Sequence, residues 1–110
     1  MDLPPRLRRL PRATVPGLPH TDVRVAATHR ARLLGLAGLR RLPQDAALLL
    51  LSTRAVHTFG MCFSIDLVWL DARWRPVRTD LSVPPRRLRH CRQARAVVEL
   101  TAGDDVTTVT

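Results

Sequence analysis

Cysteine and histidine side chains offer the most direct chemistry in this chain. His57 lies five residues before Cys62, and His90 lies next to Cys91. A thiolate beside an imidazole can act as a nucleophile, so Cys62 with His57 or His90 is one hypothesis for an active site. The same four side chains could bind zinc, but the chain has no C-x-x-C or H-x-x-x-H spacing. Neighbouring residues on a strand also point to opposite faces, so we expect neither a metal nor a cofactor.

Arginine accounts for all 18 basic residues, against nine acidic ones, and the formal net charge is +9. A basic surface attracts nucleic acid. However, a phosphate-binding face has no reason to exclude lysine, which also binds phosphate well. A genome-wide bias toward arginine explains the composition more simply, so nucleic-acid association is an alternative hypothesis. Its candidate contacts lie in one basic stretch: Arg86, Arg87, Arg89 and Arg92.

The length of 110 residues and the 45% hydrophobic content suit one domain with one modest core. Residues 1–20 are rich in proline and arginine, which predicts a flexible lead-in, and residues 21–110 are expected to form a single β-rich domain. The longest wholly apolar run spans residues 46–51, whereas a membrane helix needs about 20 residues. The basic start also lacks the apolar stretch of a signal peptide. We therefore expect a cytoplasmic protein that does not enter a membrane.

The elements that must position these side chains are predicted to be mostly strands. From His57 to Trp69 every second residue is almost always apolar, which indicates one or two strands lying on a core and places Phe59 and Phe63 on the core face. Thr28 is a good cap for a short helix. The predicted fold class is mainly β: a small single-domain barrel or sandwich with one short helix. Further strands are expected at residues 21–27, 46–51, 76–81, 94–100 and 106–110.

Several motifs carry a resemblance to a known family. The run H-T-F-G-M at residues 57–61, followed by F-x-I-D at 63–66, is the most specific of them, and T-x-x-x-R-x-x-G-L at 28–36 is another. Together with residues 42–49 and 94–103, these stretches resemble, in order and spacing, the uncharacterised family known as domain of unknown function 192. The resemblance covers about residues 23–103. It implies a compact β fold with a small helical insertion, and it brings no established activity.

The polar residues within the matched stretches are the best candidates for a site. They are Arg32, His57, Thr58, Asp66 and Glu99. One interpretation is structural, with Arg32 paired to Asp66 or Glu99 as a salt bridge between helix and sheet. The other is a pocket in which Arg32 binds an anionic group while His57 and Thr58 orient it.

The leading functional hypothesis is a non-enzymatic module that binds a small anionic ligand or a protein partner near Arg32, His57 and Asp66. The alternatives are a basic nucleic-acid-associated protein and a small enzyme that uses Cys62 or His57. The predicted core position of most aromatic residues argues against a stacking platform for nucleic-acid bases.

Overall fold

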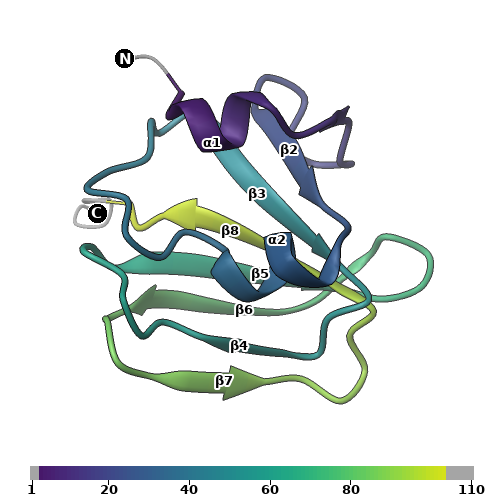
Figure 1. Ribbon diagram of the computed structural model, residues 1–110. Coiled ribbons are helices and arrows are strands. Elements are labelled where there is room, and N and C mark those ends of the chain that lie inside the picture. The colour runs from purple at the N-terminus through teal and green to yellow at the C-terminus, as the bar shows by residue number, and fades with distance from the viewer. Residues whose placement is uncertain (1–2, 104–110) are drawn as a thin grey trace.

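The computed structural model describes residues 3–103, and its main feature is a six-stranded sheet with the strand order β1-β2-β3-β8-β5-β6 (Figure 1). The strands β2 and β3 are parallel, and all other neighbours in the sheet are antiparallel. A separate two-stranded sheet pairs β4 with β7. The elements are α1 (Pro5–Arg8), β1 (Arg12–Ala13), β2 (Asp22–Ala26), α2 (His29–Leu34), β3 (Ala46–Leu51), β4 (Ala55–His57), β5 (Ile65–Leu70), β6 (Pro76–Val83), β7 (Leu88–His90) and β8 (Ala96–Thr101).

Both faces of the large sheet are covered, so the fold is a mainly β, sandwich-like domain and not a closed barrel. One core cluster joins the sheet to α1, α2 and the β4–β7 pair, and it includes Leu7, Leu36, Val56 and Trp69. A second cluster lies on the opposite face. The expected fold class is therefore confirmed, in the sandwich form, with the four-residue helix α1 in addition to α2.

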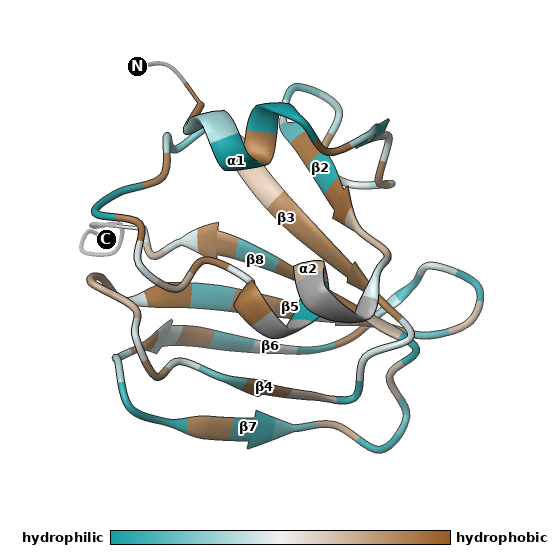
Figure 2. Cartoon of the chain, in the orientation of Figure 1, coloured by the Kyte–Doolittle hydropathy of each residue, from teal (hydrophilic) through white to brown (hydrophobic). Residues whose placement is uncertain are grey.

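The strand β3 forms where the sequence is uninterruptedly apolar. Residues 46–50 are all buried, and Figure 2 shows β3 coloured as hydrophobic along its length. A strand buried on both faces needs apolar side chains at every position, which explains why the run does not alternate. The connection from β2 to the parallel strand β3 passes through α2, whose first turn is capped by Thr28 accepting a hydrogen bond of 3.0 Å from the Ala31 N–H.

Part of the predicted lead-in packs against the domain. The side chains of Leu7 and Val15 are buried in the two core clusters. Arg24 of β2 holds this segment in place, because its Nη1 donates to the carbonyls of Arg8 (3.0 Å) and Leu10 (3.2 Å). Residues 3–20 are thus in contact with the domain along much of their length, whereas the predicted strand at 106–110 lies outside the described residues.

The alternating pattern after His57 gives one wrong prediction. Phe59 was expected on the core face, but its side chain is 55% exposed. The reason is that β4 ends at His57 and the chain turns at Gly60, which has a φ of +83°, so the strand alternation stops until β5 begins. Phe63 is half-buried against the core, and Trp69 is fully buried as expected. No helix among the described residues is long and apolar enough to cross a membrane.

Candidate functional site

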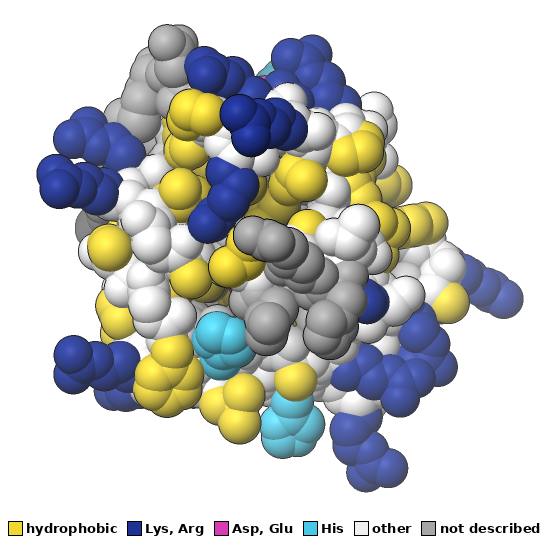
Figure 3. Space-filling view, in the orientation of Figure 1, with side chains coloured by type: hydrophobic (Ala, Val, Ile, Leu, Met, Phe, Trp, Pro, Cys, Tyr) yellow, Lys and Arg dark blue, Asp and Glu magenta, His cyan; other side chains and the backbone are white. Residues whose placement is uncertain are grey.

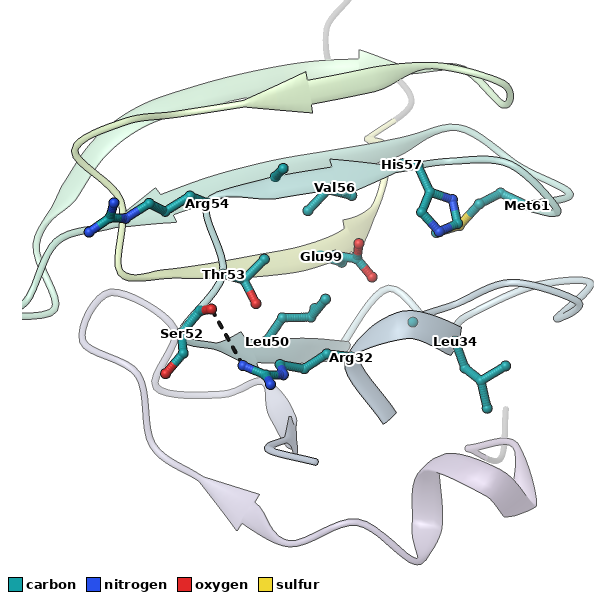
Figure 4. Close-up of a pocket in the computed structure, with 12 residues that line it drawn as sticks. Arg32, Leu34, Leu50, Ser52, Thr53, Arg54, Val56, His57, Met61 and Glu99 are labelled. Carbon is teal, nitrogen blue, oxygen red and sulfur yellow. Dashed lines mark hydrogen bonds between the residues drawn. The ribbon is translucent and has the colours of Figure 1, made fainter. Parts of the chain in front are cut away.

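A cavity of about 320 Å³ lies between α2, β4, β8 and the connection from β3 to β4. Figure 4 shows Glu99 of β8 in the middle, with Arg32 of α2 on one side and Val56 and His57 of β4 on the other. The polar part of the wall also includes Arg54. The apolar part consists of Leu34, Leu50, Val56 and Met61. The cavity therefore combines positive charge, one carboxyl group and an apolar lining.

Glu99 occupies the most buried position of the site. It lies in the central strand β8, paired with Leu48 of β3 on one side and Leu67 of β5 on the other, and only 1% of its surface is exposed. Its Oε1 is buried with no hydrogen-bond partner among the described residues. Burial raises the pKa of the Glu99 carboxyl to about 8, because an apolar environment disfavours the charged form. The side chain is therefore mainly a neutral acid at pH 7.

Gly35 follows α2 and brings the backbone close to this carboxyl. A Cβ placed on Gly35 would lie 3.3 Å from Glu99 Oε1. The backbone φ of Gly35 is +49°, a conformation that residues with a side chain rarely adopt. Its carbonyl accepts a hydrogen bond of 2.7 Å from Nη2 of Arg6, which ties the end of α2 to α1. Glycine is thus favoured here by the backbone conformation, and a residue with a Cβ would also require Glu99 to shift by a few tenths of an ångström.

Arg32 lies at the wall of the cavity with part of its guanidinium group available. Its Nη1 donates to the carbonyl of Leu51 at 3.0 Å and to that of Ser52 at 3.4 Å. Those bonds anchor the side chain to the end of β3, while Nε and Nη2 donate to none of the described residues. Among these residues Arg32 forms no ion pair with Asp66 or Glu99, so the salt bridge considered from the sequence is replaced by bonds to backbone carbonyls.

His57 contributes a second unpartnered polar atom to the site. Its Nδ1 is buried and has no hydrogen-bond partner among the residues that the structure describes. The imidazole lies with its centroid 6.1 Å from that of the Phe59 ring. Buried polar side-chain atoms are nearly always hydrogen-bonded in folded proteins, so His57 Nδ1 and Glu99 Oε1 are exceptions among the described residues, and both belong to residues that line this cavity.

The other two predicted site residues do not line the cavity. Thr58 is fully buried and fixes the loop before β7: its hydroxyl donates to the Pro84 carbonyl (2.7 Å) and accepts from the Arg87 N–H (2.8 Å). Asp66 lies one residue before Leu67, so it points to the opposite face of the sheet from Glu99. There its carboxylate accepts hydrogen bonds from Ser82 N–H (2.8 Å) and Gly103 N–H (3.4 Å).

The sequence did not predict two residues of the site, Gly35 and Arg54. Gly35 was visible as the glycine of the T-x-x-x-R-x-x-G-L pattern, but its closeness to Glu99 depends on the tertiary structure. Arg54 had no sequence signal, because it is one of many arginines. In the structure it lines the cavity, and its Nε donates to the Ala94 carbonyl at 3.3 Å.

Neither of the two cysteines lines this cavity. Cys62 is exposed and is not among the lining residues, while Cys91 is buried with its Sγ 3.8 Å from Gln93 Oε1. No group of three or more His, Cys, Asp or Glu side chains that could hold a metal ion occurs within residues 3–103.

The candidate nucleic-acid contacts lie on and around β7. Arg86, Arg87 and Arg92 are exposed, and Arg89 is half-buried. Figure 3 shows arginine side chains around the margin of one face of the molecule, with hydrophobic side chains between them. The exposed Phe59 lies close to this stretch, because the preceding Thr58 hydrogen-bonds to the backbone of Arg86 and Arg87.

Comparison with known proteins identifies the family. The sequence pattern of domain of unknown function 192, described as an uncharacterized ACR, matches residues 12–105. The chain belongs to this family. No curated protein is significantly similar to this member in sequence. The family match extends about ten residues further toward the N-terminus than the resemblance in the motifs, and so it includes β1.

Two crystal structures share the fold of this family member. A protein of unknown function from Novosphingobium aromaticivorans DSM 12444 has a TM-score of 0.70 and 12% identity, over 94% of this chain and 89% of that one. A candidate transcription regulator from Sinorhizobium meliloti 1021 has a TM-score of 0.69 and 21% identity, over 76% of this chain and 70% of that one. At these identities the likeness concerns the fold alone.

Proposed function

We propose that this member of the family is a non-enzymatic module that binds a small anionic molecule in the cavity between α2, β4 and β8. The observation that carries the proposal is the meeting of Arg32 with two buried, unpartnered polar atoms, Glu99 Oε1 and His57 Nδ1, on the wall of one cavity. Ligand pockets typically combine an apolar lining with a few convergent polar groups of this kind.

The charge of the cavity favours an anion. Arg32 and Arg54 are both lining residues, and Glu99 adds little negative charge at pH 7 because burial raises its pKa to about 8. The guanidinium of Arg32 is held by two backbone carbonyls, so little side-chain freedom is lost when its remaining N–H groups bind a carboxylate or phosphate.

A thermal-shift experiment tests the proposal. Acetate, succinate, succinamate and inorganic phosphate are added to the purified protein, with sodium chloride as the ionic-strength control. A ligand at about 100 times its Kd stabilises the folded state by roughly 2.7 kcal/mol, so a clear rise in Tm is expected. Arg32→Ala and the milder Arg32→Lys should remove or reduce the rise, whereas Arg40→Ala, which changes an exposed arginine outside the cavity, should not.

The comparison is made between ligand-induced shifts within each variant, so a lower Tm of an Arg32 variant does not affect the conclusion. A shift of equal size in wild type and both Arg32 variants, or no shift with any of the anions, would refute binding at this cavity.

A second candidate function is association with single-stranded nucleic acid, and the exposure of Phe59 favours it. An exposed aromatic ring beside arginines is the usual surface for base stacking and phosphate contact. Phe59 adjoins the stretch that carries Arg86 and Arg87. This candidate predicts that binding of a thymidine oligonucleotide weakens steeply with salt and that Phe59→Ala weakens it further. Binding that is insensitive to salt or to Phe59→Ala would exclude it.

A further inference from the structure

The deep end of the cavity has hydrogen-bonding capacity that an anion alone does not use. Glu99 Oε1 and His57 Nδ1 are buried and unpartnered among residues 3–103, and both side chains line the cavity. Figure 4 shows the Glu99 carboxyl facing the space between α2 and β4. A buried polar group without a partner lowers stability, so an occupant that supplies hydrogen bonds here is favoured.

The surroundings of Glu99 disfavour the charged form of its carboxyl. Its two strand neighbours are Leu48 and Leu67, both fully buried. The titratable or charged groups that share the cavity are Arg32 from α2, Arg54 from the β3–β4 connection and His57 from β4, and none of them donates a hydrogen bond to Glu99. A carboxyl in this setting is neutral at pH 7, which agrees with the raised pKa of about 8.

A neutral carboxyl has a distinctive hydrogen-bonding pattern. It presents one O–H donor and one C=O acceptor side by side. A carboxamide presents the complementary pair, an N–H donor next to a C=O acceptor. The two groups can therefore form paired hydrogen bonds, whereas a second carboxylate or an alkyl group would leave part of the Glu99 carboxyl unpartnered.

We propose that the ligand is a small anion that also carries a neutral amide-type group, and that this group pairs with the Glu99 carboxyl while the anionic group binds Arg32. The inference rests on the proposed function, because it assumes that an anion binds in an Arg32-dependent manner. It adds the chemical class of the other end of the ligand. The apolar side chains Leu34, Leu50 and Met61 then contact the part between the two polar ends.

Isothermal titration calorimetry with matched probes tests the ligand class. Succinamate has a carboxylate and a carboxamide. Succinate replaces the amide with a second carboxylate, isocaproate replaces it with an isopropyl group of similar size, and γ-aminobutyrate carries an ammonium group. At pH 7 succinamate should bind at least about tenfold more tightly than the other three, because only it satisfies both atoms of the Glu99 carboxyl.

The pH profile provides a second, independent readout. Succinamate binding to the wild type should weaken by about tenfold for each pH unit above the pKa of Glu99, because the ionised form has lost its donor. Glu99→Gln retains a donor and an acceptor at every pH, and it leaves Arg32, Arg54 and His57 in place. The variant should therefore bind succinamate at pH 7 and lose none of that affinity up to pH 9.5.

The outcomes separate this inference from the proposed function. Equal, Arg32-dependent affinities for succinamate, succinate and isocaproate would overturn the amide assignment and leave the anion site standing. Tightest binding of γ-aminobutyrate would show an ionised Glu99 and would also overturn it. A wild-type affinity for succinamate that does not change with pH would also overturn the amide assignment. The absence of Arg32-dependent binding of every probe would overturn both proposals.

Discussion

Gly35 lies directly against the carboxyl group of Glu99, so closely that a methyl group added to Gly35 would be 3.3 Å from Oε1. The contact joins the end of α2 to β8, which lies inside the sheet between β3 and β5. The backbone after α2 and the carboxyl that β8 presents therefore form adjoining parts of the cavity wall.

Gly35→Ala should therefore affect both stability and the site. Alanine at a φ of +49° is strained, which costs about 1–3 kcal/mol, and its Cβ would push the Glu99 side chain or α2 aside. We expect a lower free energy of unfolding in urea and a smaller ligand-induced thermal shift. Gly17→Ala is the control, because Gly17 also has a positive φ, of +91°, and no atom lies within 4 Å of its added Cβ. An equal loss of ligand response in both variants would contradict the contact as the cause.

Glu99→Gln should change how stability depends on pH. The folded-state pKa of Glu99 is raised from 4.5 to about 8, so its contribution to stability is complete below pH 4.5 and is lost as pH rises through 8. Within that window the unfolded chain releases a proton that the folded chain keeps, and stability falls by at most about 1.4 kcal/mol per pH unit. Glutamine cannot ionise, so the variant should gain stability relative to wild type as pH rises.

Urea titrations of wild type and Glu99→Gln at pH 5, 6.5 and 8 measure this difference. Because the other titratable groups are shared, the difference between the two curves belongs to Glu99. A constant difference across these pH values would mean that Glu99 is already ionised in the folded state.

Thr58→Val should destabilise the domain without changing the cavity. The buried hydroxyl of Thr58 bridges the Pro84 carbonyl and the Arg87 N–H, and valine has the same shape but no hydroxyl. Leaving those groups without partners costs about 1–3 kcal/mol. Thr79→Val, at an exposed position of β6, is the matched control and should change the unfolding free energy little. Ligand-induced shifts should be unchanged in Thr58→Val; a selective loss would assign Thr58 to the site instead.

Asp66→Ala should loosen the junction of β5 and β6. The pairing of these strands shifts between Ile65 and Leu67, and Ser82, at a φ of +52°, donates its N–H to the Asp66 carboxylate. Removing the acceptor should cost about 1 kcal/mol and should speed hydrogen exchange of the Ser82 amide. Asp66→Asn keeps an acceptor, so its stability and its Ser82 exchange rate should lie between those of the wild type and Asp66→Ala. Unchanged exchange at Ser82 in the alanine variant would show that the side chain does not hold this bulge.

Local patterns predicted the strands well and their arrangement poorly. The run of residues 46–51 coincides with β3, because unbroken apolar character is a direct consequence of burial on both faces. The parallel pairing of β2 with β3 and the separate β4–β7 sheet were not predictable, since they depend on contacts between residues far apart in the sequence. Phe59 was misplaced because a turn at Gly60 interrupts a pattern that continues unbroken in the sequence.

The candidate site was predictable only in part, for a geometrical reason. Arg32, His57 and Glu99 reach one cavity from α2, β4 and β8. Thr58 is adjacent to His57, but β4 has ended there, and the Thr58 hydroxyl bonds to the loop between β6 and β7. Leu67, and not Asp66, pairs with Glu99 across the strands. Neighbouring residues of a strand point to opposite faces of the sheet, so the Asp66 side chain lies on the face away from Glu99.

The position of β8 in the sheet has a consequence for how the chain folds during synthesis. β8 is the last strand of the described chain, yet it lies between β3 and β5 and pairs with both. Until residues 96–101 leave the ribosome, the facing edges of these two leucine-rich strands have no partner, and unpaired apolar edges are prone to aggregation. Assembly of the central sheet therefore requires β8, and the cavity forms in the same step, because Glu99 belongs to the strand that joins β3 to β5.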